Sequence, residues 1–130
     1  MKTIIAGSRN ITDYNDAILA IKNSGFTITE IVSGGAKGVD ALGERYGMDN
    51  NIPVRVFPAD WENNGRGAGH IRNTQMAEYA EALIAIWDGI SPGTSNMIQT
   101  ARNKGLKVYV EKLSNAQILK EMPRIPWKEE

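Results

Sequence analysis

The stretch from Val32 to Asp40, "VSGGAKGVD", holds three glycines and one lysine within nine residues. It completes a short β-branched run, "EIVS", so a strand, a glycine-rich turn and a helix are expected in that order. Such a turn after a strand usually lets a ligand, often a phosphate, approach the backbone closely. The spacing differs both from Gly-x-x-x-x-Gly-Lys-Ser/Thr and from Gly-x-Gly-x-x-Gly. The stretch therefore predicts a site without identifying its ligand.

The same order of strand and helix repeats along the whole chain. Asp13 is a good N-cap and Gly25 a good C-cap for the first helix. Strands are expected at residues 3–6, 30–33, 54–57, 82–87 and 107–110. Helices are expected at residues 13–25, 38–47, 68–79 and 94–104, with a last short helix near 114–122. The segment 58–69 is expected to be a polar, glycine-rich loop.

The strands are apolar runs rather than alternations of polar and apolar residues, which is typical of a parallel sheet covered on both faces. The fold class is therefore α/β, a single Rossmann-like doubly wound parallel sheet of about five strands flanked by helices. We favour the strand order 3-2-1-4-5, with the flavodoxin-like order 2-1-3-4-5 as the alternative. Residues 1–110 form the domain, and the C-terminal helix and tail, 111–130, pack on it.

Ligands of such sheets bind outside the carboxyl ends of the strands, where the winding reverses. In the favoured order this crevice lies between strands one and four, beside helix N-termini that attract anions. The alternatives are that Ser33, Thr94 and Asp88 serve as caps, that glycines only make turns, and that Trp61 closes the core instead of stacking on a base. The expected ligand-binding residues are Gly7, Ser8, Arg9, Ser33, Gly34, Gly35, Lys37, Gly38, Asp40, Trp61, Arg72, Asn73, Asp88, Ser91, Gly93, Thr94 and Ser95.

Composition excludes several classes of protein and site. The chain has 130 residues, 15 basic and 15 acidic, so its zero net charge argues against binding of duplex nucleic acid. It has no cysteine, and its one histidine, His70, has no partners at metal spacing, so neither a metal nor a cofactor is expected. The first apolar run is too short for a signal peptide, and no run could span a membrane. We expect a cytoplasmic protein whose partner is a small molecule.

Six motifs together resemble a known family: "GSR", "SGGAKGVD", "FPADW", "AGHIRN..M", "LIAIWDG" and "SPGTSNMI..A". In this order, over about residues 1–110, they resemble the SLOG superfamily in its small stand-alone YspA-like branch. That superfamily includes cytokinin-activating phosphoribohydrolases, the DNA-processing protein DprA and sensors of nucleotide-derived signals. The resemblance implies a pocket for a nucleotide or nucleotide-like ligand. Members of the superfamily often pair through helices, so the resemblance leaves two states open, a monomer and a homo-oligomer. The apolar tail "PRIPW" is expected to cover either a neighbouring copy or its own sheet.

The resemblance to the phosphoribohydrolases is incomplete. Arg72 and Met76 resemble the family's Arg-x-x-x-Met segment, and "SPGTSNM" resembles a shortened Pro-Gly-Gly-x-Gly-Thr-x-Glu-Glu segment. The family's catalytic carboxylates then fall on Asn96 and Met97, and a neutral amide cannot accept a proton as a base does. The candidates for a relocated carboxylate are Asp40, Asp60 and Asp88, and no spacing selects among them.

Three functions follow, in this order of preference. The first is a sensor or sequestering module for a nucleotide or nucleotide-derived ligand. In this function the backbone N–H groups of the 34–38 loop hold a phosphate, and the planar Arg72 guanidinium donates two hydrogen bonds to phosphate or ribose oxygens. For Arg72 the alternative is an exposed ion pair with Glu62. The second is a nucleotide N-glycosidase with a relocated carboxylate. The third is a single-stranded DNA-binding protein, which would need a local patch made by Arg66, Arg72 and Arg102.

Overall fold

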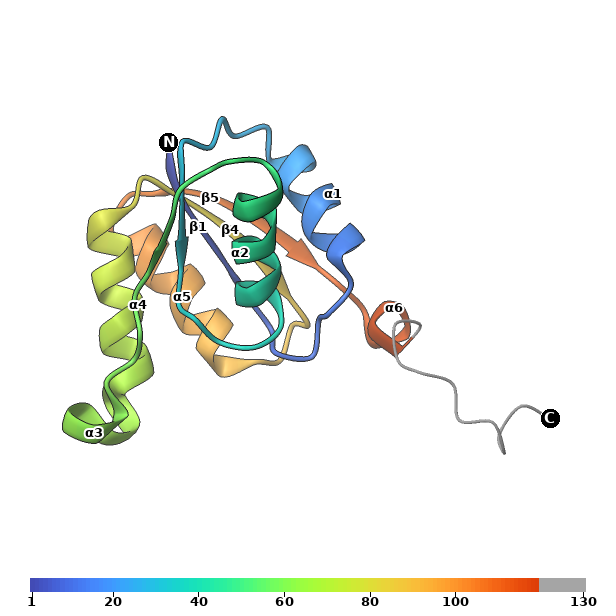
Figure 1. Ribbon diagram of the computed structural model, residues 1–130. Helices are drawn as coiled ribbons and strands as arrows, with labels where there is room; N and C mark the ends of the chain where they lie inside the picture. Colours follow the sequence, from blue (N-terminus) through green and yellow to red (C-terminus); the bar gives the residue numbers. More distant parts are fainter. Residues whose placement is uncertain (120–130) are drawn as a thin grey trace.

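Strands and helices alternate through the computed structural model, which describes residues 1–119 of the chain (Figure 1). Two short elements, the helix α3 and the 3-10 helix η1, interrupt this alternation after β3. The strands are β1 (Lys2–Gly7), β2 (Glu30–Ser33), β3 (Val54–Val56), β4 (Ala82–Trp87) and β5 (Lys107–Lys112). The helices are α1 (Tyr14–Ser24), α2 (Val39–Asp49), α3 (Trp61–Asn64), η1 (Gly65–Gly67), α4 (Ala68–Tyr79), α5 (Pro92–Asn103) and α6 (Asn115–Leu119).

The five strands form one parallel sheet in the order β3-β2-β1-β4-β5. The favoured order is confirmed and the flavodoxin-like alternative is wrong. β1 and β4 pair from Thr3 opposite Ala82 to Gly7 opposite Ile86. The winding reverses between these two strands, so their carboxyl ends form the edge at which such sheets bind ligands.

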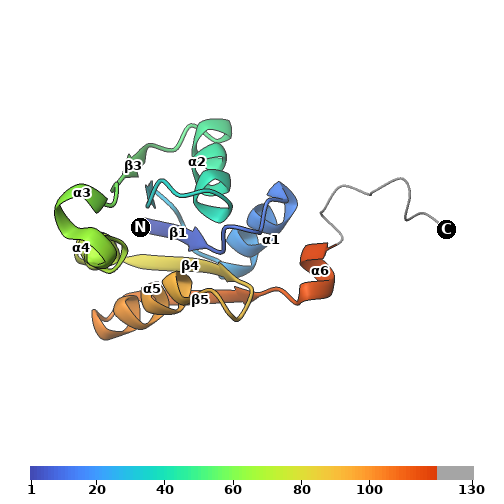
Figure 2. The ribbon, with the colours of Figure 1, turned by 90° about the horizontal axis from the view of Figure 1, so that it is seen from below.

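Each face of the sheet has its own apolar core, as a doubly wound sheet requires. Ile5 and Ile84 pack with α1 and α2 on one face, whereas Ile4 and Leu83 pack with α4 and α5 on the other. The two helix layers lie on opposite sides of the sheet (Figure 2). Successive residues of β1 and β4 are therefore buried on both faces, which is why these strands read as unbroken apolar runs.

The first helix begins and ends where its caps predict. The Asp13 carboxylate accepts a 2.9 Å hydrogen bond from the N–H of Asn15. Gly25 closes the helix in the left-handed conformation, at φ +70°, and donates its N–H to the carbonyl of Lys22.

The segment 58–69, expected to be a loop, contains α3 and η1. Asp60 is the N-cap of α3 and accepts hydrogen bonds from the N–H and the side-chain amide of Asn63. No side chain of α3 is buried, so the sequence carries no apolar periodicity to signal this helix. In Figure 1, α3 projects from the end of α4 away from the sheet.

The chain beyond β5 packs against the face that α1 and α2 cover, where Leu113 and Ile118 join the core. Residues 120–130, which include "PRIPW", lie outside the described residues, so the packing of the tail stays a prediction. Among residues 1–119, every helix is too short or too polar to span a bilayer.

Helix α2 approaches the sheet closely because position 43 is glycine. A β-carbon there would lie 2.9 Å from both Cβ and Cγ2 of Ile5, a fully buried residue of the central strand. Overpacking a core costs about 1–3 kcal/mol, whereas alanine within a helix gains about 0.5–1 kcal/mol over glycine.

We expect Gly43→Ala to lower the free energy of unfolding by about 1–2 kcal/mol, since the clash with Ile5 exceeds the gain in helix propensity. Urea denaturation followed by circular dichroism measures this change. Gly67→Ala is the matched control, because a β-carbon there has no other atom within 4 Å. It should stay within about 0.5 kcal/mol of the wild type. Equal stabilities of Gly43→Ala and wild type would contradict the close packing of α2.

Candidate ligand-binding site

A cavity of about 570 Å³ opens at the carboxyl ends of β1 and β4. This is the edge that the favoured strand order predicted. The loop after β1, the loop after β4, the first turn of α5 and the beginning of α4 all contribute to its wall. The expected ligand-binding residues that line it are Gly7, Ser8, Arg9, Asp40, Trp61, Arg72, Asn73, Asp88, Ser91, Gly93 and Thr94.

The remaining expected residues do not line this cavity. They are Ser33, Gly34, Gly35, Lys37, Gly38 and Ser95. Ser33 has a structural role: its hydroxyl donates a 2.6 Å hydrogen bond to Glu44 and accepts one from the N–H of Gly35. Of the glycine-rich loop 34–38, only Ala36 reaches the cavity, and its N–H donates to Asp40. Two N–H groups that were expected to face a phosphate are therefore bonded within the protein.

Asp40 is the buried carboxyl group of the site, with 5% of its surface exposed. Its Oδ2 accepts a 3.2 Å hydrogen bond from the N–H of Ala36. Burial raises the pKa of Asp40, while the N–H of Ala36, the charge of Arg72 and the N–H of Gly7 oppose that rise only in part. The glycine-rich loop thus encloses a carboxyl group that is more basic than an ordinary aspartate.

Arg72 lies against the same loop. Its Nη1 donates a 2.5 Å hydrogen bond to the carbonyl of Gly34, and its Nε donates to Oδ1 of Asn73. Burial lowers the pKa of Arg72, the charge of Asp40 opposes that effect, and Arg9 adds to it. No ion pair with Glu62 is present among residues 1–119, so that alternative for Arg72 is wrong.

Gly34 permits this arrangement because it has no side chain. A β-carbon at position 34 would lie 2.6 Å from Nη1 of Arg72 and 2.8 Å from Oδ2 of Asp40. The guanidinium and the carboxyl group therefore share the space that a side chain at position 34 would fill. The role of this glycine is steric: it admits two side chains of opposite charge.

The first turn of α5 keeps backbone donors available. Its N-cap, Ser91, makes no side-chain capping bond, because its hydroxyl donates instead to Asp88. Pro92 has no N–H, and the N–H groups of Gly93 and Thr94 have no partner among residues 1–119. These two donors and the positive end of the helix dipole lie at the cavity wall.

Asp88 is a loop cap, as one of the alternatives predicted. Its carboxylate accepts hydrogen bonds from the N–H groups of Ile90 and Ser91 and from the Ser91 hydroxyl. Burial raises the pKa of Asp88, but the hydrogen bonds from Ser91, Ile90 and Ser8 outweigh burial, so the pKa lies below its ordinary value. A carboxylate this well solvated by donors is a poor general acid.

Three arginines line the cavity: Arg9, Arg66 and Arg72. Within residues 1–119 none of them has a carboxylate partner within 4 Å, because the ion pairs there are Arg45–Asp49 and Lys104–Glu78. A neutral chain thus concentrates unpaired positive charge at one edge of its sheet. The same residues gather no group of three histidine, cysteine or acidic side chains that could hold a metal ion.

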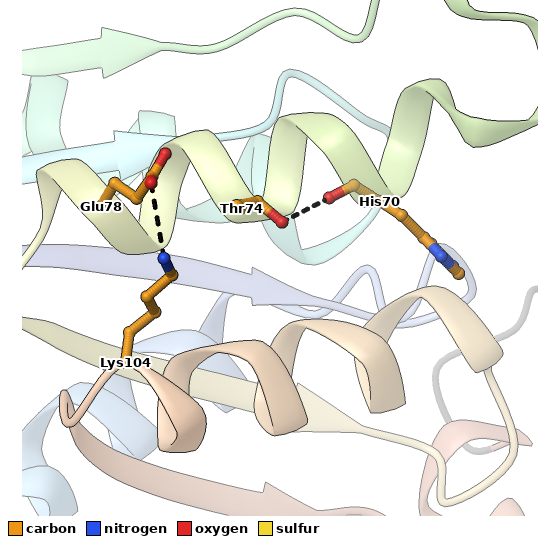
Figure 3. A network of polar contacts seen from close by, with 4 residues as sticks. All are labelled: His70, Thr74, Glu78 and Lys104. Atoms are coloured by element: carbon orange, nitrogen blue, oxygen red, sulfur yellow. Dashed lines mark hydrogen bonds and ion pairs between the residues drawn. The ribbon is translucent and has the colours of Figure 1, made fainter.

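Hydrogen bonds and an ion pair connect helices α4 and α5. Asn73 donates its side-chain amide to Oδ1 of Asn96 at 3.0 Å and to the carbonyl of Gly93 at 3.3 Å. At the far end Lys104 and Glu78 form an ion pair of 3.4 Å (Figure 3). The figure also shows His70 directed from α4 toward the beginning of α5. Asn96 therefore joins the two helices.

Comparison with known proteins identifies the family of the chain. The family model YAcAr, described as the YspA, cpYpsA-related SLOG family, matches residues 1–64. The Gene 61 protein of Mycobacterium phage D29 is 34% identical over 84 residues, which cover 60% of this chain and 67% of that protein. The chain belongs to the YspA, cpYpsA-related SLOG family. The resemblance that the motifs indicated is confirmed.

The fold also matches a solved structure. DNA processing protein A (DprA) from Streptococcus pneumoniae superposes with a TM-score of 0.66 at 16% identity. The match covers 95% of this chain and 62% of the DprA chain, so this family member spans less than two thirds of that protein. At this identity the likeness supports the Rossmann-like fold alone.

Some cavity residues were not expected from the sequence. The sequence predicts a role for Arg66 only in a DNA-binding patch, and Met97 stands only where a carboxylate is missing. The segment Gly65–Gly67 that contains Arg66 has no apolar periodicity from which its place could be predicted. The positions of α3 and η1 bring Arg66 to the cavity. The other unexpected lining residues are Ala6, Asn10, Ala36, Gly69, His70 and Pro92.

The buried Asp40 predicts a pH dependence of stability. Its pKa in the folded protein lies above the ordinary value of 3.8, so its stabilising contribution is complete below that pH and is lost as the pH rises through the folded-state pKa. We expect Asp40→Asn to gain stability relative to the wild type as the pH rises from about 4 to 7. Urea denaturation across this range measures the difference.

Asp60→Asn is the control with the opposite sign. The hydrogen bonds from Asn63 lower the pKa of Asp60, so its contribution is present above pH 3.8 and lost as the pH falls. Asp60→Asn should therefore lose stability relative to the wild type as the pH rises. Parallel pH profiles for the two variants would contradict a buried, basic Asp40.

Proposed function

We propose that the cavity binds a nucleotide or a nucleotide-derived signalling molecule, and that the protein senses or sequesters this ligand. One observation carries the proposal. Three guanidinium groups that have no carboxylate partner among residues 1–119 line the same cavity as the open N-terminus of a twelve-residue helix. Paired donors of this kind fit phosphate oxygens, which arginine binds through two parallel hydrogen bonds.

The uncharged parts of a nucleotide also find complementary groups. Trp61 is 55% exposed at the cavity, where its indole offers a face for stacking a base. Asp40 and Asn73 supply oxygens that accept hydrogen bonds from ribose hydroxyls, as an acidic residue does in many dinucleotide sites. The cavity volume of about 570 Å³ falls within the usual range for small-molecule sites.

Hydrolysis of the N-glycosidic bond is the second candidate. It is favoured by Asp40, a buried carboxyl group beside the Arg72 guanidinium, since burial raises the pKa of Asp40 and makes it a better proton acceptor than an ordinary aspartate. Against it stands Asn96, whose amide is engaged with Asn73 instead of a substrate. We rank binding without turnover first.

Binding of single-stranded DNA ranks third. DprA is by name a DNA processing protein, and Arg66 and Arg72 line the cavity of this chain. Arg102, however, lies in the last turn of α5, whereas the first turn of that helix forms the cavity wall. Nine residues of helix separate Gly93 from Arg102, or roughly 14 Å. These three side chains therefore do not form one patch.

The first test concerns the arginines. Arg72→Lys keeps the charge but loses the planar fork, so we expect affinity for adenosine or guanosine monophosphate to fall at least about tenfold, or about 1.4 kcal/mol. Isothermal titration calorimetry measures it. Arg102→Lys is the matched control outside the cavity and should bind like the wild type. Equal affinities for both variants and wild type would remove Arg72 from the site.

The second test concerns turnover. We expect no release of free base from adenosine, guanosine, cytidine or uridine monophosphate during long incubation at high protein concentration, because Asn96 and Met97 occupy the positions of the family's carboxylates. Chromatography of the products measures this. Robust release that Asp40→Asn abolishes and Asn96→Ala does not would establish the hydrolase instead and identify Asp40 as its relocated carboxylate.

A further inference from the structure

A second pocket of about 480 Å³ lies beside the first. The loop after β3 and helix α3 contribute Pro58, Ala59, Asp60 and Asn64 to it, and α4 contributes Ala68, Ile71 and Gln75. Arg72 also lines this pocket, and it is the residue of the described chain that the two pockets share. The volumes are similar, so each pocket offers room for a unit of about the same size.

From this juxtaposition we propose that the ligand has two nucleoside ends joined by a chain of phosphates, which crosses Arg72 so that each pocket holds one end. The inference rests on the proposed function and specifies the class of nucleotide.

Arg72 is suited to lie under the phosphates. Its Nη1 bonds Gly34 and its Nε bonds Asn73, which fixes the plane of the guanidinium. The remaining N–H donors of Arg72 have no partner among residues 1–119 and can bind phosphate oxygens. On the side of the first pocket, Arg9 and Arg66 add positive charge for the same chain of phosphates.

The second pocket is suited to a neutral nucleoside rather than to a further phosphate. Apart from Arg72 no lysine or arginine of the described chain lines it, and the Asp60 carboxylate would repel an anion. Hydrogen bonds from the Asn63 N–H and amide hold Asp60 in the ionised form. An ionised carboxylate accepts hydrogen bonds from sugar hydroxyls, and the amides of Asn64 and Gln75 offer the paired donor and acceptor that a base edge requires.

The experiment compares ligands of equal charge that have one or two nucleosides. Calorimetry compares adenosine monophosphate with diadenosine diphosphate and adenosine diphosphate with diadenosine triphosphate, and the same pairs are run with guanosine. We expect at least one two-nucleoside compound to bind about tenfold more tightly than its one-nucleoside counterpart. Gln75→Ala should abolish that advantage and leave binding of the monophosphate unchanged. Gln99→Ala, an exposed glutamine of α5 outside both pockets, should retain the advantage.

Failure of this inference is distinguishable from failure of the proposed function. If monophosphates bind but no two-nucleoside compound binds more tightly, the inference is overturned and the proposed function stands. The same holds if Gln75→Ala weakens both kinds of ligand equally or affects neither. If no compound of either series binds, both the inference and the proposed function are overturned.

Discussion

The architecture of the site depends on backbone contacts that only glycine allows. A β-carbon at Gly38, where φ is +77°, would lie 2.5 Å from the carbonyl oxygen of Ser8 and 2.6 Å from the α-carbon of Arg9. At Gly7 it would lie 2.0 Å from the carbonyl oxygen of Ile86. The loops after β1 and β2 therefore meet backbone to backbone, and the N–H of Val39 reaches the carbonyl of Ser8. Any side chain at position 7 or 38 would separate the strands and the helix that form the cavity.

This close approach determines the electrostatics of the cavity. It places α2 so that Asp40, in its first turn, is buried beside Arg72, and it leaves Arg9 exposed on the loop after β1. In the first turn of α2 the N–H of Val39 donates to the carbonyl of Ser8, whereas in α5 the N–H groups of Gly93 and Thr94 have no partner among residues 1–119. The positive end of α5 and the arginines therefore give the cavity wall its positive potential. The glycine-rich loop contributes only Ala36 to that wall, but it contacts Asp40 and Arg72, which do line it.

Asn96 takes part in the contact between the two helices that flank the cavity. The side-chain amide of Asn73, on α4, donates to Oδ1 of Asn96 and to the carbonyl of Gly93, both on α5. The amide of Asn96 thus strengthens the contact between α4 and α5 without placing a titratable group there.

The sequence by itself determined the strands, most helices and their order, because unbroken apolar runs and capping residues such as Asp13 and Gly25 are local signals. With the sheet-edge rule it also located most of the cavity residues. Only the tertiary structure decided which N–H groups stay free, since the bonds of Gly35 to Ser33 and of Ala36 to Asp40 depend on how the loop closes. It also decided the pairing of Gly34 with Arg72, 38 residues apart, and the place of the wholly exposed α3. Such contacts join distant segments and leave no periodic trace in the sequence.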